Sequence, residues 1–72
     1  MHEIRAEITA NVWQVRVEEG QLVGEGDEIV VLESMKMEIP VITEVAGVVR
    51  ELHVEPDQSI NEGDLIALID ES

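Results

Sequence analysis

Apolar and polar residues alternate along much of the chain, with the two-residue period of a β-strand that buries one face. Residues 14–17 read Gln-Val-Arg-Val and residues 52–54 read Leu-His-Val. Residues 29–33 and 65–69 are nearly continuous apolar runs, which suits strands that are covered on both faces. No segment has the 3.6-residue apolar period of a helix, so the pattern predicts short β-strands throughout.

Turn-forming residues separate these segments. Glu-Gly-Asp stands before each apolar run, at 25–27 and at 62–64, and the alternating segments are followed by Glu-Glu-Gly at 18–20 and Glu-Pro-Asp at 55–57. Gly and Asp tolerate a positive φ and Pro fixes its own φ, so all four stretches favour turns. Short strands with frequent turns indicate an all-β protein without helices, either a small sandwich or a flattened barrel.

The chain also repeats itself at a fixed offset. Gly26 recurs as Gly63, 37 positions later (63 − 26), and the same offset relates other identical pairs: Val12–Val49, Val17–Val54, Glu18–Glu55, Gln21–Gln58, Glu25–Glu62, Asp27–Asp64 and Ile29–Ile66. One unit this short rarely buries its apolar face alone, so two copies, about residues 2–33 and 39–70, are expected to pack together. A pseudo-twofold axis between them puts the junction, residues 34–38, at one end of the molecule and the chain termini at the other.

The junction has to reverse the chain although its residues are not turn formers. Local propensity extends one strand from Ile29 to Ile42, because no glycine or asparagine interrupts it. The repeat instead requires a turn near Met35 and Lys36, since the strand at 29–33 corresponds to the last strand of the chain. A tight hairpin there needs a positive φ at both central residues. That conformation costs a non-glycine residue about 1–3 kcal/mol and tends to mark a functional site.

Charge and composition narrow the range of functions. The 72 residues include 17 acids against four bases, a net charge of −13, which disfavours nucleic acids and anionic membranes as partners. A chain this small is expected to form one domain, and its charge to keep that domain soluble and monomeric. It has no cysteine, and we find neither a signal peptide nor a transmembrane run, so we expect a cytoplasmic protein.

We do not expect an independent enzyme. The chain is too short to hold both a core and a deep cleft, and it has no Ser-His-Asp constellation and no glycine-rich phosphate loop. His2 lies near the amino terminus and His53 is phased as an outward strand residue, and two separated histidines do not make a metal site. We therefore predict no catalytic and no metal-binding residues.

Lys36 is the residue with the most distinctive setting. It is the only lysine, and it stands between Met35 and Met37 at the centre of the repeat. Lysine amines are mostly protonated at neutral pH, and the anions Glu33 and Glu38 favour the charged form. Lys36 is therefore a weak nucleophile by itself, better suited to being modified by another protein. The methionines supply adaptable apolar contacts for a partner, unless they point into the core instead.

The stretch Glu-Ser-Met-Lys-Met-Glu, residues 33–38, resembles the acceptor motif of biotin carboxyl carrier domains. The Glu-Gly-Asp turns and the continuation Glu-Ile-Pro-Val-Ile-Thr-Glu-Val-Ala-Gly-Val-Val are similar as well, so the resemblance covers essentially the whole chain. It is greatest to the small stand-alone biotin/lipoyl attachment proteins of bacteria. Ser34 replaces the alanine usual before Met-Lys-Met, and there is no room for the thumb loop of some acetyl-CoA carboxylase carriers.

The resemblance implies a flattened β-barrel of two four-stranded antiparallel sheets, with the acceptor lysine on a hairpin opposite the termini. It implies that Lys36 carries biotin covalently, that Met35 and Met37 are its recognition flanks, and that Glu33, Ser34 and Glu38 form the hairpin around it. A biotin protein ligase would attach the biotin through biotinyl-adenylate. The arm would then carry carboxyl groups between biotin carboxylase and carboxyltransferase subunits.

Two other functions remain open. A lipoyl-carrying domain would have the same fold, although lipoyl domains typically place Asp before the lysine and a small residue after it, where this chain has Met35 and Met37. An unmodified interaction module would make Lys36 an ordinary solvated turn residue. Trp13, the only aromatic residue, has Arg50 as its repeat mate, so we expect it near the surface, covering the edge of the barrel.

Overall fold

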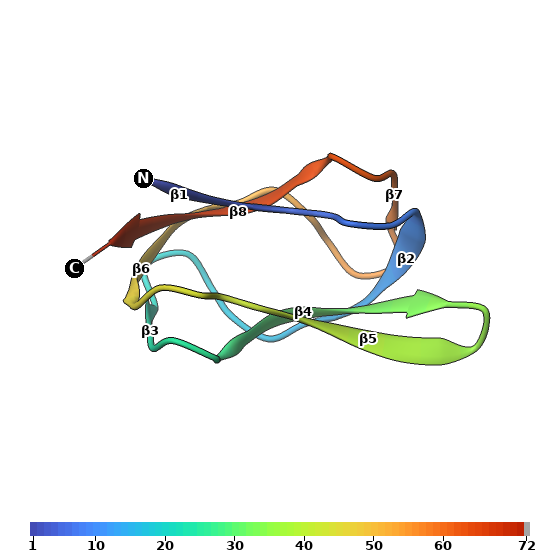
Figure 1. Ribbon diagram of the computed structural model, residues 1–72, viewed down its shortest axis with the longest axis horizontal. Helices are drawn as coiled ribbons and strands as arrows, with labels where there is room; N and C mark the ends of the chain where they lie inside the picture. Colours follow the sequence, from blue (N-terminus) through green and yellow to red (C-terminus); the bar gives the residue numbers. More distant parts are fainter. Residues whose placement is uncertain (72) are drawn as a thin grey trace.

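The computed structural model describes residues 1–71, which form eight β-strands and no helix. The strands build two four-stranded sheets, ordered β1-β8-β6-β3 and β5-β4-β2-β7, and all neighbours are antiparallel. This confirms the predicted all-β fold of two such sheets (Figure 1). The strand bounds are β1 His2–Arg5, β2 Ala10–Val15, β3 Leu22–Val23, β4 Glu28–Ser34, β5 Met37–Ile42, β6 Gly47–Leu52, β7 Ser59–Ile60 and β8 Leu65–Glu71.

The two apolar runs lie at the centre of the fold. β4 and β8 are interior strands of their sheets, and each gives the core three almost fully buried side chains at matching repeat positions: Ile29, Val30 and Leu32, and Ile66, Ala67 and Ile69. Burying an aliphatic side chain of the size of valine or leucine contributes about 1.5–3 kcal/mol. The alternating segments run past the ends of β2 and β6, and Val17 and Val54 still reach the core there.

Equivalent hydrogen bonds hold the two repeats together. The Gly26 N–H donates to the Thr43 carbonyl at 2.8 Å, and the Gly63 N–H donates to the Ala6 carbonyl at 2.8 Å, with every residue shifted by the repeat offset. Both glycines have a φ of 91°, a conformation in which any other residue is strained. The aspartate after each glycine accepts a backbone N–H from three residues upstream at 2.8 Å. The Gly-Asp pair that reveals the repeat in sequence therefore builds the same turn twice.

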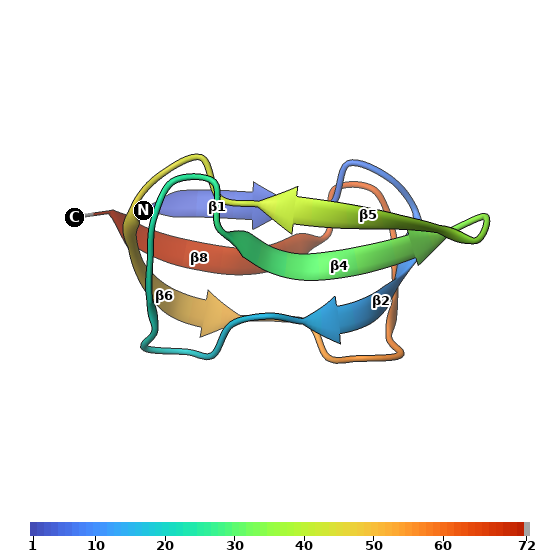
Figure 2. The same cartoon turned by 90° about the horizontal axis from the view of Figure 1, so that it is seen from below.

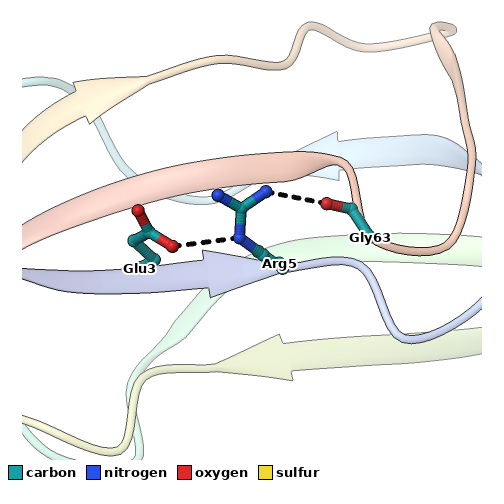
Figure 3. A network of polar contacts seen from close by, with 3 residues as sticks. All are labelled: Glu3, Arg5 and Gly63. Carbon is teal, nitrogen blue, oxygen red and sulfur yellow. Dashed lines mark hydrogen bonds and ion pairs between the residues drawn. The ribbon is translucent and has the colours of Figure 1, made fainter.

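Arg5 makes a contact that the second repeat lacks. Its Nη1 donates to the Gly63 carbonyl at 2.8 Å, and its Nε donates to Glu3 Oε1 at 3.0 Å (Figure 3). Because its repeat mate is Ile42, the twofold-related position has no guanidinium. Arg5 therefore ties the end of β1 to the turn before β8.

Trp13 occupies an irregularity in β2. The register of β2 on β4 shifts between Val12 and Gln14, which leaves Trp13 as the extra residue beside Val31. Trp13 is 40% exposed, while Val31 is only 4% exposed although it lies outside the core cluster. Trp13 therefore lies near the surface, as its repeat mate predicts. The expectation that it covers the edge of the barrel is wrong, because β2 is an interior strand of its sheet.

The molecule is elongated, with extents of 35 × 17 × 17 Å. The β4–β5 hairpin projects at one end, while β1 begins and β8 finishes towards the opposite end (Figures 1 and 2). β5 is an edge strand, which suits Pro40, because proline has no N–H for a second strand. The junction between the repeats is thus the outermost point of one end, as the pseudo-twofold axis predicts.

Candidate attachment site

Met35 and Lys36 form the two-residue turn of the β4–β5 hairpin. Ser34 and Met37 are paired at its base, so the chain reverses within these two residues. The φ angles are 52° at Met35 and 64° at Lys36, which confirms the predicted positive φ at both positions. Left-handed backbone costs a non-glycine residue about 1–2 kcal/mol. The hairpin accepts this cost at two successive positions, neither of them a glycine or an asparagine.

The turn exposes all three central side chains of the motif. Met35 is 92% exposed, Met37 is 64% exposed, and Lys36 is exposed between them. The alternative in which the methionines pack into the core is therefore wrong. Two exposed methionines contribute little to folding, and their flexible, polarisable side chains suit contact with a partner.

The base of the hairpin is acidic on one side. Glu33 and Glu38 are register partners across β4 and β5, and both are exposed. Like charges directly opposite each other weaken a pair of strands slightly. The ion pairs of residues 1–71 link other side chains, so neither glutamate is neutralised by an arginine: Arg5–Glu3, Arg16–Glu28, Arg50–Asp70 and, when the imidazole is charged, His53–Glu51. Fold stability does not explain this pair of acids.

A polar groove of about 310 Å³ lies beside the hairpin. The hairpin lines one side with residues 33–36, and residues 9–11 and 59–61 line the rest. Within it the Ser59 hydroxyl donates to Asn11 Oδ1 at 2.8 Å. Sequence reasoning did not select these two segments, because they are remote from Lys36 along the chain.

Other candidate chemistry is sparse. A second groove, of about 390 Å³, runs between the edge strands β1 and β5 and includes Ile4, Leu32 and Val41, but it does not include Lys36. His53 is exposed and its Nε2 lies 2.7 Å from Glu51 Oε1. Within residues 1–71 no three histidine, aspartate or glutamate side chains gather as metal ligands would. The described part of the chain forms no helix that is long and apolar enough to span a lipid bilayer.

Fold and site together define a small twofold β-sandwich that presents one lysine at the apex of a strained hairpin. The family model described as "Biotin-requiring enzyme", for biotin/lipoyl domains, matches residues 3–69. The chain therefore belongs to the biotin/lipoyl attachment family, as its resemblance to that family predicts.

Named relatives agree with this assignment. A biotinylated protein TB7.3 homolog of Mycobacterium leprae is 54% identical over 67 residues, which are 93% of this chain and 94% of that protein. A biotin/lipoyl attachment protein of Bacillus subtilis is 36% identical over 63 residues, covering 88% of this chain and 86% of that protein.

A solved structure shows the same fold inside a much larger protein. A single-chain, multi-domain long-chain acyl-CoA carboxylase matches with a TM-score of 0.92 and 28% identity. The match covers 99% of this chain and only 7% of the carboxylase chain. This chain thus corresponds to a small part of that enzyme.

Proposed function

We propose that the protein is a biotin carrier and that biotin is attached to Lys36 by a biotin protein ligase. The observation that carries the proposal is the geometry of the hairpin. A strained two-residue turn holds the only lysine of the chain at the outer end of the molecule, between two exposed methionines. The family assignment and the biotinylated relative support biotin as the attached group.

In the proposed reaction this chain is the acceptor. The ammonium group of Lys36 first gives up one proton, and the neutral Nζ attacks the carboxyl carbon of biotinyl-adenylate. The bond from that carbon to the phosphate oxygen breaks, AMP leaves with that oxygen, and the nitrogen releases a second proton as the amide forms. The ligase supplies the activation: Lys36 is exposed at the tip of the hairpin, and the charged residues that flank the turn, Glu33 and Glu38, are anions, which do not make the amine a better nucleophile. Met35 and Met37 would contact the ligase, and Glu33, Ser34 and Glu38 form the base of the hairpin that presents them.

The structure fits the attached group. The amine is exposed, it is unhindered at a tip, and the groove beside it is large enough to contact a small ring system. Biotin on this arm would supply a nitrogen that accepts and releases a carboxyl group. We propose that separate biotin carboxylase and carboxyltransferase proteins use the arm in the cytoplasm, with this chain as a monomer. The match to one region of a long-chain acyl-CoA carboxylase supports a carboxylase as partner.

The direct test is ligation with purified components. The protein is incubated with biotin, ATP and a biotin protein ligase, and intact mass spectrometry and streptavidin blotting follow the product. We expect one added biotin, located on Lys36 by peptide mapping. An unlabelled protein, under conditions in which a known carrier is labelled, would refute the proposal and favour an interaction module.

Lipoate is the second candidate for the attached group. The Bacillus subtilis relative is called a biotin/lipoyl attachment protein, which supports testing both groups on Lys36. Intact mass of the protein purified from its native cells distinguishes them, because the two acyl groups differ in mass. A lipoyl mass alone would replace biotin by lipoate in the proposal.

A further inference from the structure

We propose that the polar groove beside Lys36 is a resting site for the ureido ring of the biotin carried on that same lysine. This inference depends on the proposed function, since it assigns a place to the group attached there. The groove is formed by three segments that the fold brings together: residues 9–11, 33–36 and 59–61.

The repeat shows that the fold itself does not require a polar groove. The side chains of Thr9, Asn11 and Ser59 have repeat mates that are all apolar: Ala46, Val48 and Leu22. Val48 and Leu22 are exposed and are register partners, just as Asn11 and Ser59 are. The pair β3–β6, which the repeat relates to β2–β7, therefore forms with apolar residues at these two positions. It lies at the end of the molecule that has no lysine.

The strand beside each of these pairs carries an acid in both repeats, since Asn11 is the register partner of Glu33 and Val48 is the register partner of Asp70, the repeat mate of Glu33. The difference between the two ends is therefore the Asn11–Ser59 pair, which is polar only beside Lys36, and this pair points to a ligand at that end.

The groups in the groove match the hydrogen bonds of a ureido ring, which has two N–H donors and one carbonyl acceptor. Ser59, Asn11 and Glu33 are successive register partners across β7, β2 and β4, so they form one row. Asn11 Oδ1 accepts the Ser59 hydroxyl, which leaves the Asn11 Nδ2 hydrogens to donate to the ring carbonyl. The Glu33 carboxylate takes no part in the ion pairs of residues 1–71, and it can accept a ring N–H.

Size and position also agree. The groove volume of about 310 Å³ lies at the lower end of the range for small-molecule sites. Lys36 and Met35 themselves line it, so the attached arm starts at its wall. Met35 can pack against the apolar part of the bound group. The groove is shallow and solvent-facing, so the ring is expected to exchange between this resting position and an extended one.

Chemical acylation tests the inference without a ligase. Isotope-labelled protein is acylated at Lys36 with an activated ester of biotin or, as the matched control, of pentanoic acid, which gives the same amide and chain without the ring. The amine of the chain terminus also reacts with these esters. The Lys36→Arg variant, which is acylated only at that terminus, therefore shows which spectral changes come from the terminal adduct. The readout is the set of amide resonances in a ¹H–¹⁵N spectrum.

We expect the biotinyl adduct, and not the pentanoyl adduct, to shift the side-chain amide of Asn11 and the backbone amides of residues 9–11 and 59–61. Identical spectra of the two adducts in these segments would overturn the inference. Since the adduct is made chemically, that result would leave the ligase reaction of the proposed function untouched.

Substitution by the repeat mate gives a second readout. Asn11→Val replaces Asn11 by valine, the residue type of its repeat mate Val48. The fold is therefore expected to tolerate the change, and the ¹H–¹⁵N spectrum of the variant checks that it is folded. We expect streptavidin to capture biotin from this variant at least twofold faster than from the wild-type adduct in stopped flow, because the resting position is lost. An unchanged capture rate in a folded variant would count against the site.

Discussion

Lys36 is presented by backbone strain. It and Met35 adopt left-handed φ values of 64° and 52° that the chain could avoid with asparagine and glycine at the same positions. A turn of only two residues requires these φ values, and it places the lysine at the outermost point of the hairpin. Met35 and Met37 stay exposed beside it, so all three side chains are accessible from outside the hairpin.

Replacing Met35 by glycine separates strain from recognition. We expect Met35→Gly to keep or raise the free energy of unfolding, by up to about 1 kcal/mol, because glycine tolerates this φ. We expect the initial rate of biotinylation to fall several-fold, because the variant lacks the side chain that we propose contacts the ligase. Urea unfolding and timed streptavidin blots give the two quantities.

Asp57→Gly is the matched control for that change. Asp57 also has a positive φ, 70°, and its repeat mate Gly20 has 89°, but it lies far from the hairpin in the sequence and outside the groove. It should show the same stability trend with unchanged labelling. Wild-type labelling of Met35→Gly would remove Met35 from the recognition flanks.

Met37→Ala tests the second flank. A surface substitution usually changes stability by no more than about 0.5 kcal/mol, so the melting temperature should hardly move, while ligation or carboxylase turnover slows several-fold. Ile42→Ala, an exposed residue further along β5, should leave labelling unchanged. A large drop in melting temperature at an unchanged rate would instead mean that Met37 packs against the body.

Lys36→Arg is the decisive change at the site. Arginine keeps the positive charge but its guanidinium is not acylated under these conditions. We expect no incorporated biotin by intact mass and a circular dichroism spectrum like that of the wild type. Labelling that persists on the variant would assign the acceptor to another group.

At the scale of the strands, the two repeats have nearly the same structure but differ in side-chain size at single buried positions. Gly47 of β6 is buried, and a Cβ built there would meet the backbone of Asp70 and Glu71 in β8. Its repeat mate, Ala10 in β2, has a Cβ and is also buried. The same place in the fold thus accepts a methyl group in one repeat and excludes it in the other.

Gly47→Ala therefore tests the packing of β6 on β8. Because the obstructing atoms are backbone, relief requires the strands to move, and overpacking of this kind costs about 1–3 kcal/mol. In a domain of this size each 1 kcal/mol corresponds to about 4–8 °C in melting temperature. Differential scanning calorimetry measures the loss, with Ala10→Gly as the companion variant. A melting temperature equal to that of the wild type would show that β8 can shift away from the added methyl group without loss of stability.

At the scale of the whole molecule, charge is the dominant feature. The net charge of −13 is spread over a body of 35 × 17 × 17 Å, and the ion pairs of residues 1–71 are all exposed and contribute little. Repulsion among the acids opposes the compact state of the protein. The proposed attachment at Lys36 would remove the only lysine ammonium group of the chain, so the net charge would change from −13 to −14.

Salt should therefore stabilise the protein. Screening shortens the range of repulsion from about 30 Å at 0.01 M to about 10 Å at 0.1 M ionic strength. We expect the melting temperature to rise by a few degrees over that interval when it is followed by circular dichroism. Sucrose at matched viscosity controls for general solvent effects. A melting temperature that falls with added salt would show that the exposed ion pairs outweigh the repulsion.

The sequence by itself determined the backbone plan. Alternating residues predict the strands, and Gly26 and Gly63 reveal the repeat. The repeat in turn requires the reversal at Met35 and Lys36 that local propensity misses. These features are readable because strand period and turn chemistry depend on near neighbours, and a repeat relates distant segments without any knowledge of contacts.

Only the tertiary structure decided which side chains share a surface. Alternation left both methionines free to be buried or exposed, and their exposure depends on how far the hairpin extends beyond the body. Asn11 and Ser59 meet because β7 pairs with β2, and they reach Glu33 because β2 pairs with β4. Contacts between segments so far apart are fixed by the packing of the two sheets, which no local pattern encodes.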